Sequence, residues 1–193
     1  MRLRFLAVPG VILLACAVLT GCASGANAAD EGADLTPVAT SESPEPSAGE
    51  AAALAQAQAW LDATSLPTGA VPLEGTPPRF DSFTSWPCGP YEELKSYWLV
   101  PATTVADAGN WLLDNPPAGL ITTHFWPLVE DGPGSDSAII GFIPAEGAQE
   151  GVVYTLKKMD ADLAVRAEVA AQTDTATCPP LPDGGMHGAP GQG

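Results

Sequence analysis

The chain has 193 residues, and its 23 acidic residues far outnumber its 7 basic ones. Arg2 and Arg4 lie at the extreme N-terminus, whereas every acidic residue lies beyond position 29. Nucleic-acid binding needs clustered Lys and Arg to neutralise phosphates, so this balance argues against that class, and it disfavours electrostatic docking on anionic lipid. Four Cys and two His are too few for a zinc-finger array or a multi-His centre, and the sequence predicts no metal and no cofactor.

The N-terminal segment has the pattern of a secretory signal. Two arginines precede an apolar run over residues 5–19, which is followed by Thr20, Gly21 and Cys22. A membrane-spanning helix needs about 20 apolar residues. The run is shorter, and Pro9-Gly10 interrupts it. Residues 1–21 are therefore predicted to be a signal peptide rather than a transmembrane anchor.

The end of this segment, Leu19-Thr20-Gly21-Cys22, resembles the lipobox of bacterial lipoproteins. In that family a diacylglyceryl group is attached to the Cys thiol, and a dedicated peptidase cuts before it. The resemblance implies fatty acylation (palmitate) of Cys22 and a location at the extracytoplasmic face of the cell membrane. Cys16 also follows Leu and Ala, but it would leave too short an apolar run. An ordinary signal, cut near Ala26 or Ala29, would instead release a soluble protein.

Two segments have the composition of disordered chain. Residues 22–47 consist largely of Ala, Ser, Pro, Thr and acidic residues without an aromatic residue, and residues 179–193 are rich in Pro and Gly. Neither can bury enough apolar surface to offset its ordering entropy. The sequence thus predicts a lipidated tether, a single domain over 48–178 and a disordered tail.

The domain is expected to open with a helix over 48–63. Ser47 and Glu50 have the spacing of a capping box. Leu54, Ala57 and Leu61 recur at helical spacing, with Trp60 beside them. These four residues are the predicted buried face.

The middle of the domain mixes short elements with irregular chain. A short strand is expected at 70–73, an irregular Pro-rich segment at 74–88 and a strand at 97–100. A second helix follows, because Thr104 and Asp107 form another capping pattern. Its predicted buried face is made by Val105, Ala108, Trp111 and Leu112.

The last third favours β-structure. Residues 121–126 are ambiguous, 138–143 read as a central strand, and 152–158 with 163–171 read as a hairpin around the turn 159–162. In the final strand four aliphatic residues alternate with Ala164, Arg166, Glu168 and Ala170, which are expected to face water. The predicted fold class is α+β: a two-layer sandwich of about two helices on a mostly antiparallel sheet.

The order of these segments is similar to that of a group of uncharacterised actinobacterial secreted proteins and lipoproteins. The shared features are Leu66 to Ala70, a Trp-bearing strand, a Trp-bearing helix ending at Pro116-Pro117-Ala118-Gly119, and a closing hairpin. The similarity covers about residues 65–170 and implies no activity.

Cys88 and Cys178 are the two thiols left once the signal is removed and Cys22 is acylated. In an oxidising compartment two such thiols usually pair, so we predict a disulfide that joins the Pro-rich segment to the end of the last strand. The alternative is a reactive thiol. It would need a helix start or a basic neighbour to lower its pKa, and the sequence places neither beside these residues.

Candidate chemistry is sparse. His124 lies alone among aromatic residues, and no Gly-x-Ser-x-Gly motif accompanies it. A hydrolase would have to combine His124 with a carboxylate, so no catalytic residue is assigned. Trp86 and Trp126 lie on expected loops and are the candidates for a binding surface.

The favoured function is a non-enzymatic, lipid-anchored envelope lipoprotein that acts as a binding or accessory module. Its expected contacts are the membrane, through the anchor, and another envelope protein or a glycan, but not nucleic acid. A lipoprotein that captures a small ligand and a hydrolase using His124 are the alternatives.

Overall fold

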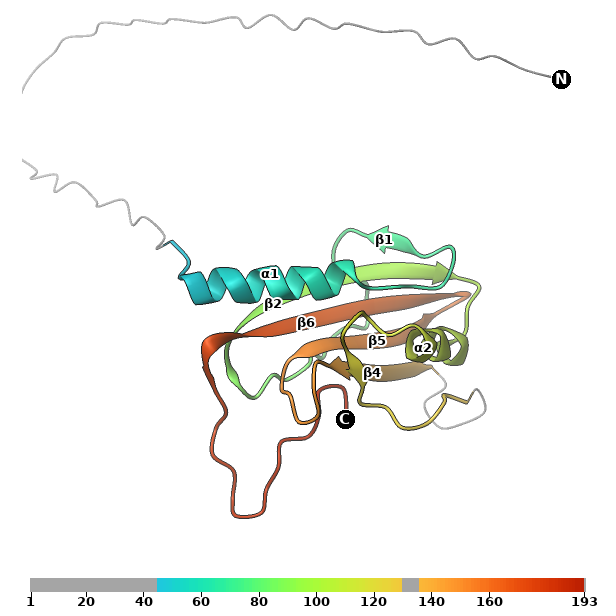
Figure 1. Ribbon diagram of the computed structural model, residues 1–193. Coiled ribbons are helices and arrows are strands. Elements are labelled where there is room, and N and C mark those ends of the chain that lie inside the picture. The colour runs from blue at the N-terminus through green and yellow to red at the C-terminus, as the bar shows by residue number, and fades with distance from the viewer. Residues whose placement is uncertain (1–44, 130–135, 193) are drawn as a thin grey trace, which may run out of the picture. The chain divides into compact units, whose positions relative to one another are not determined.

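The computed structural model describes residues 45–129 and 136–192 (Figure 1). The predicted signal peptide, Cys22 and nearly all of the predicted tether lie outside the described residues and stay predictions. Within the described part the elements follow in this order: α1 (Ala48–Asp62), β1 (Val71–Leu73), β2 (Gly89–Pro101), α2 (Val105–Asp114), β3 (Ile121–Thr122), β4 (Ser137–Ile143), β5 (Gly151–Met159) and β6 (Asp162–Thr177).

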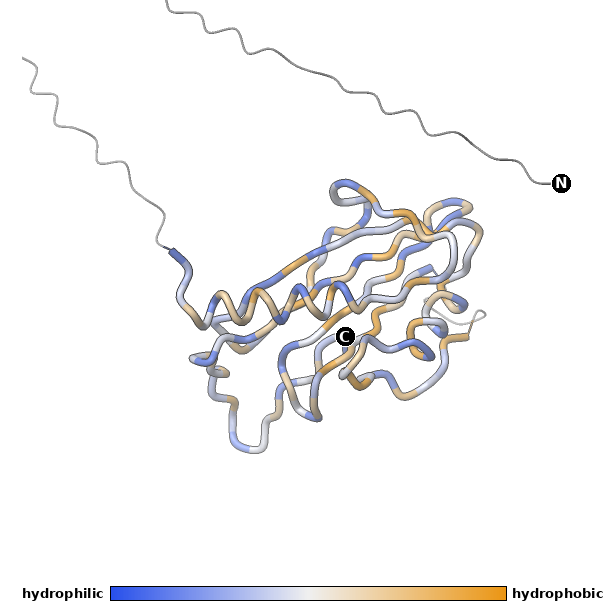
Figure 2. Tube along the Cα trace, turned by 45° about the horizontal axis from the view of Figure 1, so that its top comes forward, coloured by the Kyte–Doolittle hydropathy of each residue, from blue (hydrophilic) through white to orange (hydrophobic). Residues whose placement is uncertain are grey.

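The strands form one antiparallel sheet in the order β1-β2-β6-β5-β4-β3. Both helices pack on the same face of it, as Figure 1 shows, and the main core lies between these two layers. In Figure 2 hydrophobic residues recur along the strands of the sheet. The predicted α+β two-layer sandwich is confirmed.

Helix α1 begins as the sequence predicts. The Ser47 hydroxyl accepts from the Glu50 backbone N–H, and the Glu50 carboxylate accepts from the Ser47 N–H. The buried face is rotated from the predicted one, however. Ala53, Ala57 and Trp60 are buried, whereas Leu54 is 45% exposed. Trp60 and the small Ala53 and Ala57 belong to the core cluster that the helix forms with the sheet.

Helix α2 also has the expected cap, because the Thr104 hydroxyl accepts from the Asp107 N–H at 3.0 Å. Three residues of its predicted face are buried, but Trp111 is 39% exposed, so its assignment to the core was wrong. Gly109 faces the sheet instead. A Cβ there would clash with Leu128 and lie 3.2 Å from Ile140 Cδ1, so the helix backbone itself closes against β4.

Strands β2 and β6 are both longer than the sequence predicts, and each pairs with the other over almost its whole length. The predicted hairpin is confirmed: β5 and β6 pair around the turn 159–162, with Tyr154 opposite Ala167 and Leu156 opposite Val165. Polar residues such as Glu92 and Lys95 interrupt the hydrophobic pattern in the first half of β2, so the sequence did not indicate a strand there. The long partner strand β6 supplies backbone hydrogen bonds on one side of this stretch.

The face of the sheet away from the helices is not open to water, which corrects the sequence interpretation. Arg166 and Glu168 of β6, expected to be wet, are 2% and 0% exposed. The Pro-rich segment 74–88 lies over them, since Thr84 and Ser82 hydrogen-bond to their side chains. That segment is irregular, as predicted.

The C-terminal segment covers another part of the same face, and its predicted disorder is wrong for its last residues. The Thr123 hydroxyl donates to the Pro190 carbonyl, and the Gln192 amide donates to the Thr123 carbonyl. A Cβ at Gly141 would collide with the Pro190 carbonyl. The missing side chain at Gly141 therefore lets the tail lie directly on β4, and in Figure 1 the C-terminus ends near that strand.

Candidate functional site

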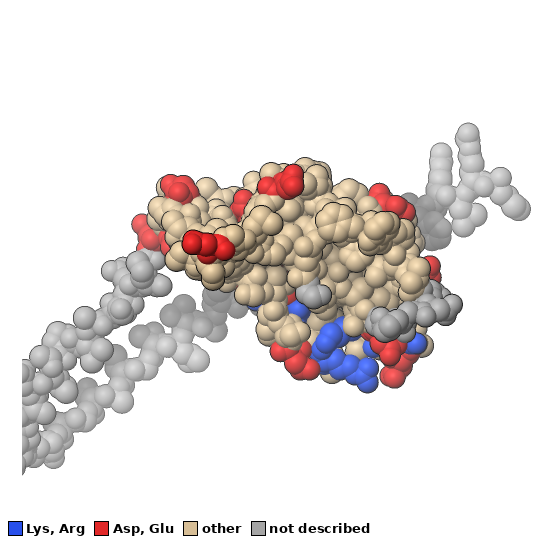
Figure 3. Space-filling model, turned by 90° about the horizontal axis from the view of Figure 1, so that it is seen from below, with Lys and Arg blue, Asp and Glu red and all other residues tan. Residues whose placement is uncertain are grey.

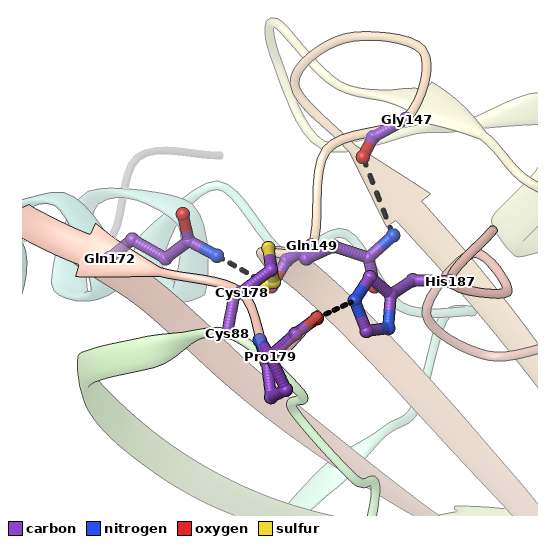
Figure 4. Close-up of a disulfide and its surroundings, with 7 residues drawn as sticks. All are labelled: Cys88, Gly147, Gln149, Gln172, Cys178, Pro179 and His187. Atoms are coloured by element: carbon purple, nitrogen blue, oxygen red, sulfur yellow. Dashed lines mark hydrogen bonds between the residues drawn. A yellow bond between two sulfur atoms is a disulfide. The ribbon is translucent and has the colours of Figure 1, made fainter. Parts of the chain in front are cut away.

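The Cys88–Cys178 disulfide is present, as the sequence predicts (Figure 4). Cys88 immediately precedes β2 and Cys178 immediately follows β6, where Gly89 pairs with Thr177. The bond thus fixes the Pro-rich segment to the end of the longest strand. Buried Gln149 and its neighbour Gln172 lie beside it in Figure 4, and Gln172 donates to the Gln149 carbonyl.

His187 also lies next to this disulfide. One of its ring nitrogens is 3.2 Å from the Pro179 carbonyl oxygen, and the other possible metal ligands within 4.8 Å are the Cys88 and Cys178 sulfurs. Metal binding by cysteine requires a free thiolate. Because the Cys88 and Cys178 sulfurs are joined in the disulfide, neither is a free thiolate that could bind a metal. The disulfide therefore has a structural role here.

Trp86 is buried, so it cannot belong to an exposed binding surface with Trp126. Its ring forms a small core with Val153 and Ala170 on the face away from the helices. Its indole N–H donates to the Glu93 carboxylate at 3.3 Å. The position of Trp86 between Pro-rich chain and Cys88 did not predict this, because the burial depends on how the segment 74–88 folds over the sheet.

Beneath that segment lies a buried ion pair that the sequence interpretation missed. Arg166 Nη2 is 2.6 Å from Glu168 Oε2. Glu168 also accepts from the backbone N–H and the hydroxyl of Thr84, while Arg166 donates to the Ser82 carbonyl and the Thr155 hydroxyl. Buried charges persist only when they are paired and hydrogen-bonded in this way.

Two aromatic rings complete the surroundings of Arg166. Its guanidinium carbon lies 5.2 Å from the centre of the Phe80 ring and 4.9 Å from that of Phe83, within the range of cation–π contacts. A signal for this arrangement existed in the sequence. Alternate positions of β6 carry small Ala164 and Ala170 around an opposite-charge pair, which suits a covered face better than a wet one.

A cavity of about 440 Å³ opens beside this cluster. Its walls are the segment 82–87 and the tail 187–192, and its floor includes Ile139, Thr155 and Arg166. These three residues form one cross-strand row, because Ile139 pairs with Thr155 and Thr155 pairs with Arg166. The cavity is thus built on three adjacent strands and closed by the two segments that the sequence leaves without regular structure.

A second candidate surface lies at the β3 edge of the sheet, in the residues that follow this strand. Phe125 is 80% exposed and Trp126 is 78% exposed, and an open hollow of about 350 Å³ adjoins them. The segment is held at both ends. Buried Thr123 hydrogen-bonds to the Gly141 carbonyl, and Asn110 of α2 makes two hydrogen bonds to the Leu128 backbone, at 2.9 and 3.0 Å.

His124 lies in this segment and is half-buried, and Asp114 lines the same hollow. The structure has no ion pair or hydrogen bond between the His124 ring and a carboxylate among the residues it describes. Within the described part of the chain, His124 makes one hydrogen bond, from its backbone N–H to the Thr122 hydroxyl. His124 and Asp114 thus line the same hollow, but among the described residues no hydrogen bond or ion pair joins them.

The charged side chains are unevenly distributed over the surface. Seen from below, the Lys and Arg side chains gather in one small region with acidic neighbours, and acidic residues elsewhere on that face lie apart from them (Figure 3). No helix in the described part of the chain is long and apolar enough to cross a membrane. Comparison with protein-family models, with curated proteins and with solved structures gives no match.

Proposed function

We propose that this chain is a lipid-anchored binding module of the cell envelope, and that Phe125 and Trp126 form the surface that contacts a protein partner. The observation that carries this proposal is the near-complete exposure of two adjacent large aromatic side chains. Folding does not bury their apolar surface, although each could yield a large hydrophobic gain. Trp and other aromatic residues are enriched at the energetic centres of protein interfaces.

The hydrogen bonds that hold the backbone on both sides of Phe125 and Trp126 favour binding as well. The hydrogen bonds of Thr123 on one side and those between Asn110 and Leu128 on the other fix the backbone of residues 123–128. A segment that is already ordered loses less conformational entropy on association. The adjoining hollow offers a place for a partner side chain beside Trp126.

A photo-crosslinking experiment in intact cells that make the protein tests the surface. Trp126→p-benzoylphenylalanine should give a discrete adduct of higher mass, because the probe would lie in the interface. Val71→p-benzoylphenylalanine is the matched control, since Val71 is exposed on the opposite edge strand, β1. A second substitution, Phe125→Ser, should remove the adduct at 126. Equal adducts at both positions, or none, would contradict the proposed surface.

The hydrolase alternative is separated from this proposal by His124→Gln. A binding module should keep its biological phenotype with this change, because the His124 ring makes no hydrogen bond within the described structure. Complementation of a deletion strain measures this, with the fold checked by near-UV circular dichroism. A folded variant that fails to complement would favour the hydrolase.

A further inference from the structure

We infer that the open edge of strand β2 is a docking site for an extended peptide of a partner protein, which adds to the sheet as a further antiparallel strand. The peptide carries apolar side chains at alternate positions and a net positive charge. The site lies on the other side of the sheet from Phe125 and Trp126, and it would remain if those two residues had no partner.

Strand β1 covers only the last part of β2. It pairs with Tyr97, Trp98 and Leu99, so residues 91–96 have no neighbouring strand on that side in the described part of the chain. Their burial agrees with this, because residues 91–96 are exposed or half-buried whereas residues 167–171 of β6, which pair with them, are buried. An exposed strand edge of this kind is where an extended peptide can join a sheet.

The backbone groups of Glu93 and Lys95 point toward this open side. Gln172 donates its backbone N–H to the Glu150 carboxylate, which lies next to β5 and away from β2. Opposite residues of an antiparallel pair either bond to each other or both point away, so Tyr91, opposite Gln172, points away from β6. This direction alternates along a strand, so Glu93 and Lys95 share it. Neither has a backbone hydrogen bond on that side within the described residues.

A cavity of about 570 Å³ begins where β1 ends and gives room for the added strand. Leu73 at the end of β1, Lys95 of β2 and Leu61 of α1 are among the residues that line it. Leu61, Leu94 and Trp98 pack against the main core on the helix side of the sheet but stay half-buried. Alternate residues of a strand share one face, so alternate apolar side chains of the peptide would cover this partly open apolar surface.

The charges at this edge favour a positively charged peptide. Asp62 lines the cavity, Glu74 follows the end of β1, and Glu92 lies in the open stretch of β2. None of these three carboxylates forms an ion pair within the described structure, whereas Lys95 is already paired with Glu93. Lys or Arg residues of a peptide would therefore find carboxylates without a counter-ion, and an acidic peptide would be repelled.

Binding of short peptides to the full-length chain in a nonionic detergent tests the inference. The probe is fluorescent Lys-Val-Lys-Val-Lys-Val with blocked ends, and its acidic counterpart has Glu in place of each Lys. Two further versions carry N-methyl groups, one on every Lys and the other on every Val. In the inferred geometry the Val side chains face α1. The Lys residues then lie opposite Glu93 and Lys95 and exchange backbone hydrogen bonds with them.

We expect the basic peptide to bind and the acidic one to bind more weakly. N-methylation of the Lys residues should weaken binding at least about tenfold, because it removes the N–H groups that face β2, whereas N-methylation of the Val residues should have little effect. In the NMR spectrum, hydrogen exchange of the Glu93 and Lys95 amides should slow on binding. The amides of Glu92 and Leu94, which already face β6, should not change.

A matched pair of variants tests the same backbone contact from the protein side. Lys95→Pro removes an N–H of the open edge and should weaken binding at least about tenfold, whereas Lys95→Ala keeps that N–H and should bind as the wild type does. Proline is tolerated on an edge strand where its nitrogen faces solvent, so the fold should survive, as near-UV circular dichroism would check.

Equal binding of the two N-methylated peptides, tighter binding of the acidic peptide, or equal effects of Lys95→Pro and Lys95→Ala would each overturn the inference. Absence of binding by the basic peptide would overturn it as well. The charged residues of β2 would then serve only to protect the edge from unwanted pairing.

Discussion

Arg166 and Glu168 show how one pair of residues can determine the character of a whole sheet face. They alternate with core residues in β6, and the usual interpretation of such alternation places them in water. In the structure they are buried because Thr84 and Ser82 complete their hydrogen bonds from a segment about 80 residues earlier. Two charges can be buried only with those partners, so the pair also fixes the fold of the segment 74–88.

The first prediction concerns this pair. Glu168→Gln leaves the Arg166 charge buried without its counter-ion, and should lower the free energy of unfolding by about 3–5 kcal/mol. Arg166→Met combined with Glu168→Leu should cost less than the sum of the single changes, because the double variant leaves no buried charge. Urea denaturation of Glu168→Gln, of the two single variants Arg166→Met and Glu168→Leu, and of the double variant measures these free energies.

The exposed Lys158–Asp136 pair is the control for that series, with contacts at 3.8 Å and both side chains mostly in water. Lys158→Met should change stability by less than about 1 kcal/mol. If Glu168→Gln lowered the free energy of unfolding no more than Lys158→Met, the buried pair would not be needed for the stability of the fold.

Tyr154 leads to a prediction about alkaline pH. Burial raises the pKa of Tyr154 from 10.0 to about 12, although the hydrogen bond to Thr64 opposes the shift. Because the folded pKa lies above the unfolded one, this contribution to stability is complete below pH 10 and is lost as the pH rises through 12. A shift of this size corresponds to a loss of about 3 kcal/mol.

Comparing unfolding free energies of the wild type and Tyr154→Phe across this pH range isolates the effect from that of other groups. The difference between the two proteins should change by the amount above. Tyr91→Phe, at an exposed position of β2, should follow the wild type. Parallel pH curves for the wild type and Tyr154→Phe would show that the phenol stays solvated.

At the scale of elements, the capping patterns were reliable and the strand limits were not. Ser47 and Thr104 mark the helix starts correctly because a cap is a local hydrogen bond within four residues. The limits of β2 and β6 depend on their pairing with each other, which joins residues about 60 to 90 positions apart. The exposure of Leu54 and Trp111 likewise depends on how each helix is rotated over the sheet.

The C-terminal tail provides a prediction at this scale. Gly141→Ala would place a methyl group against the Pro190 carbonyl and 2.6 Å from the Thr123 hydroxyl, so the tail should leave β4. We expect faster hydrogen exchange over residues 187–192 and a loss of about 1–3 kcal/mol of stability. Gly188→Ala, where an added Cβ meets nothing within 4 Å, is the control. Unchanged exchange in Gly141→Ala would mean that the tail is not held there.

At the scale of the whole molecule, charge explains why the proposed lipid anchor at Cys22 and the domain would have separate tasks. The chain beyond Cys22 is strongly acidic, so electrostatics alone would not hold it at an anionic membrane surface. Two fatty-acyl chains are enough for stable anchoring. With such an anchor, the domain would not need to touch the lipid, and its exposed Phe125 and Trp126 would stay free to contact a partner.

The matching prediction is that Cys22→Ser moves the protein from the membrane fraction to the soluble fraction and abolishes fatty-acid labelling. Cys16→Ser is the control, because it keeps the lipobox-like Leu19-Thr20-Gly21-Cys22 and should be labelled normally. Membrane retention of Cys22→Ser through its N-terminus would show that the segment acts as an anchor without lipidation.

The sequence by itself determined the α+β class, both helix starts, the closing hairpin and the Cys88–Cys178 bond, because each depends on local patterns or on counting the available thiols. It also placed Trp126 on a loop, where the structure leaves the side chain 78% exposed. Only the tertiary structure determined where Trp86, Arg166 and the tail lie and which segments they contact. Their surroundings come from segments distant in the chain that fold over the second sheet face. The small residues around Arg166 indicate that this face is covered, but no periodicity in the sequence identifies the segments that cover it.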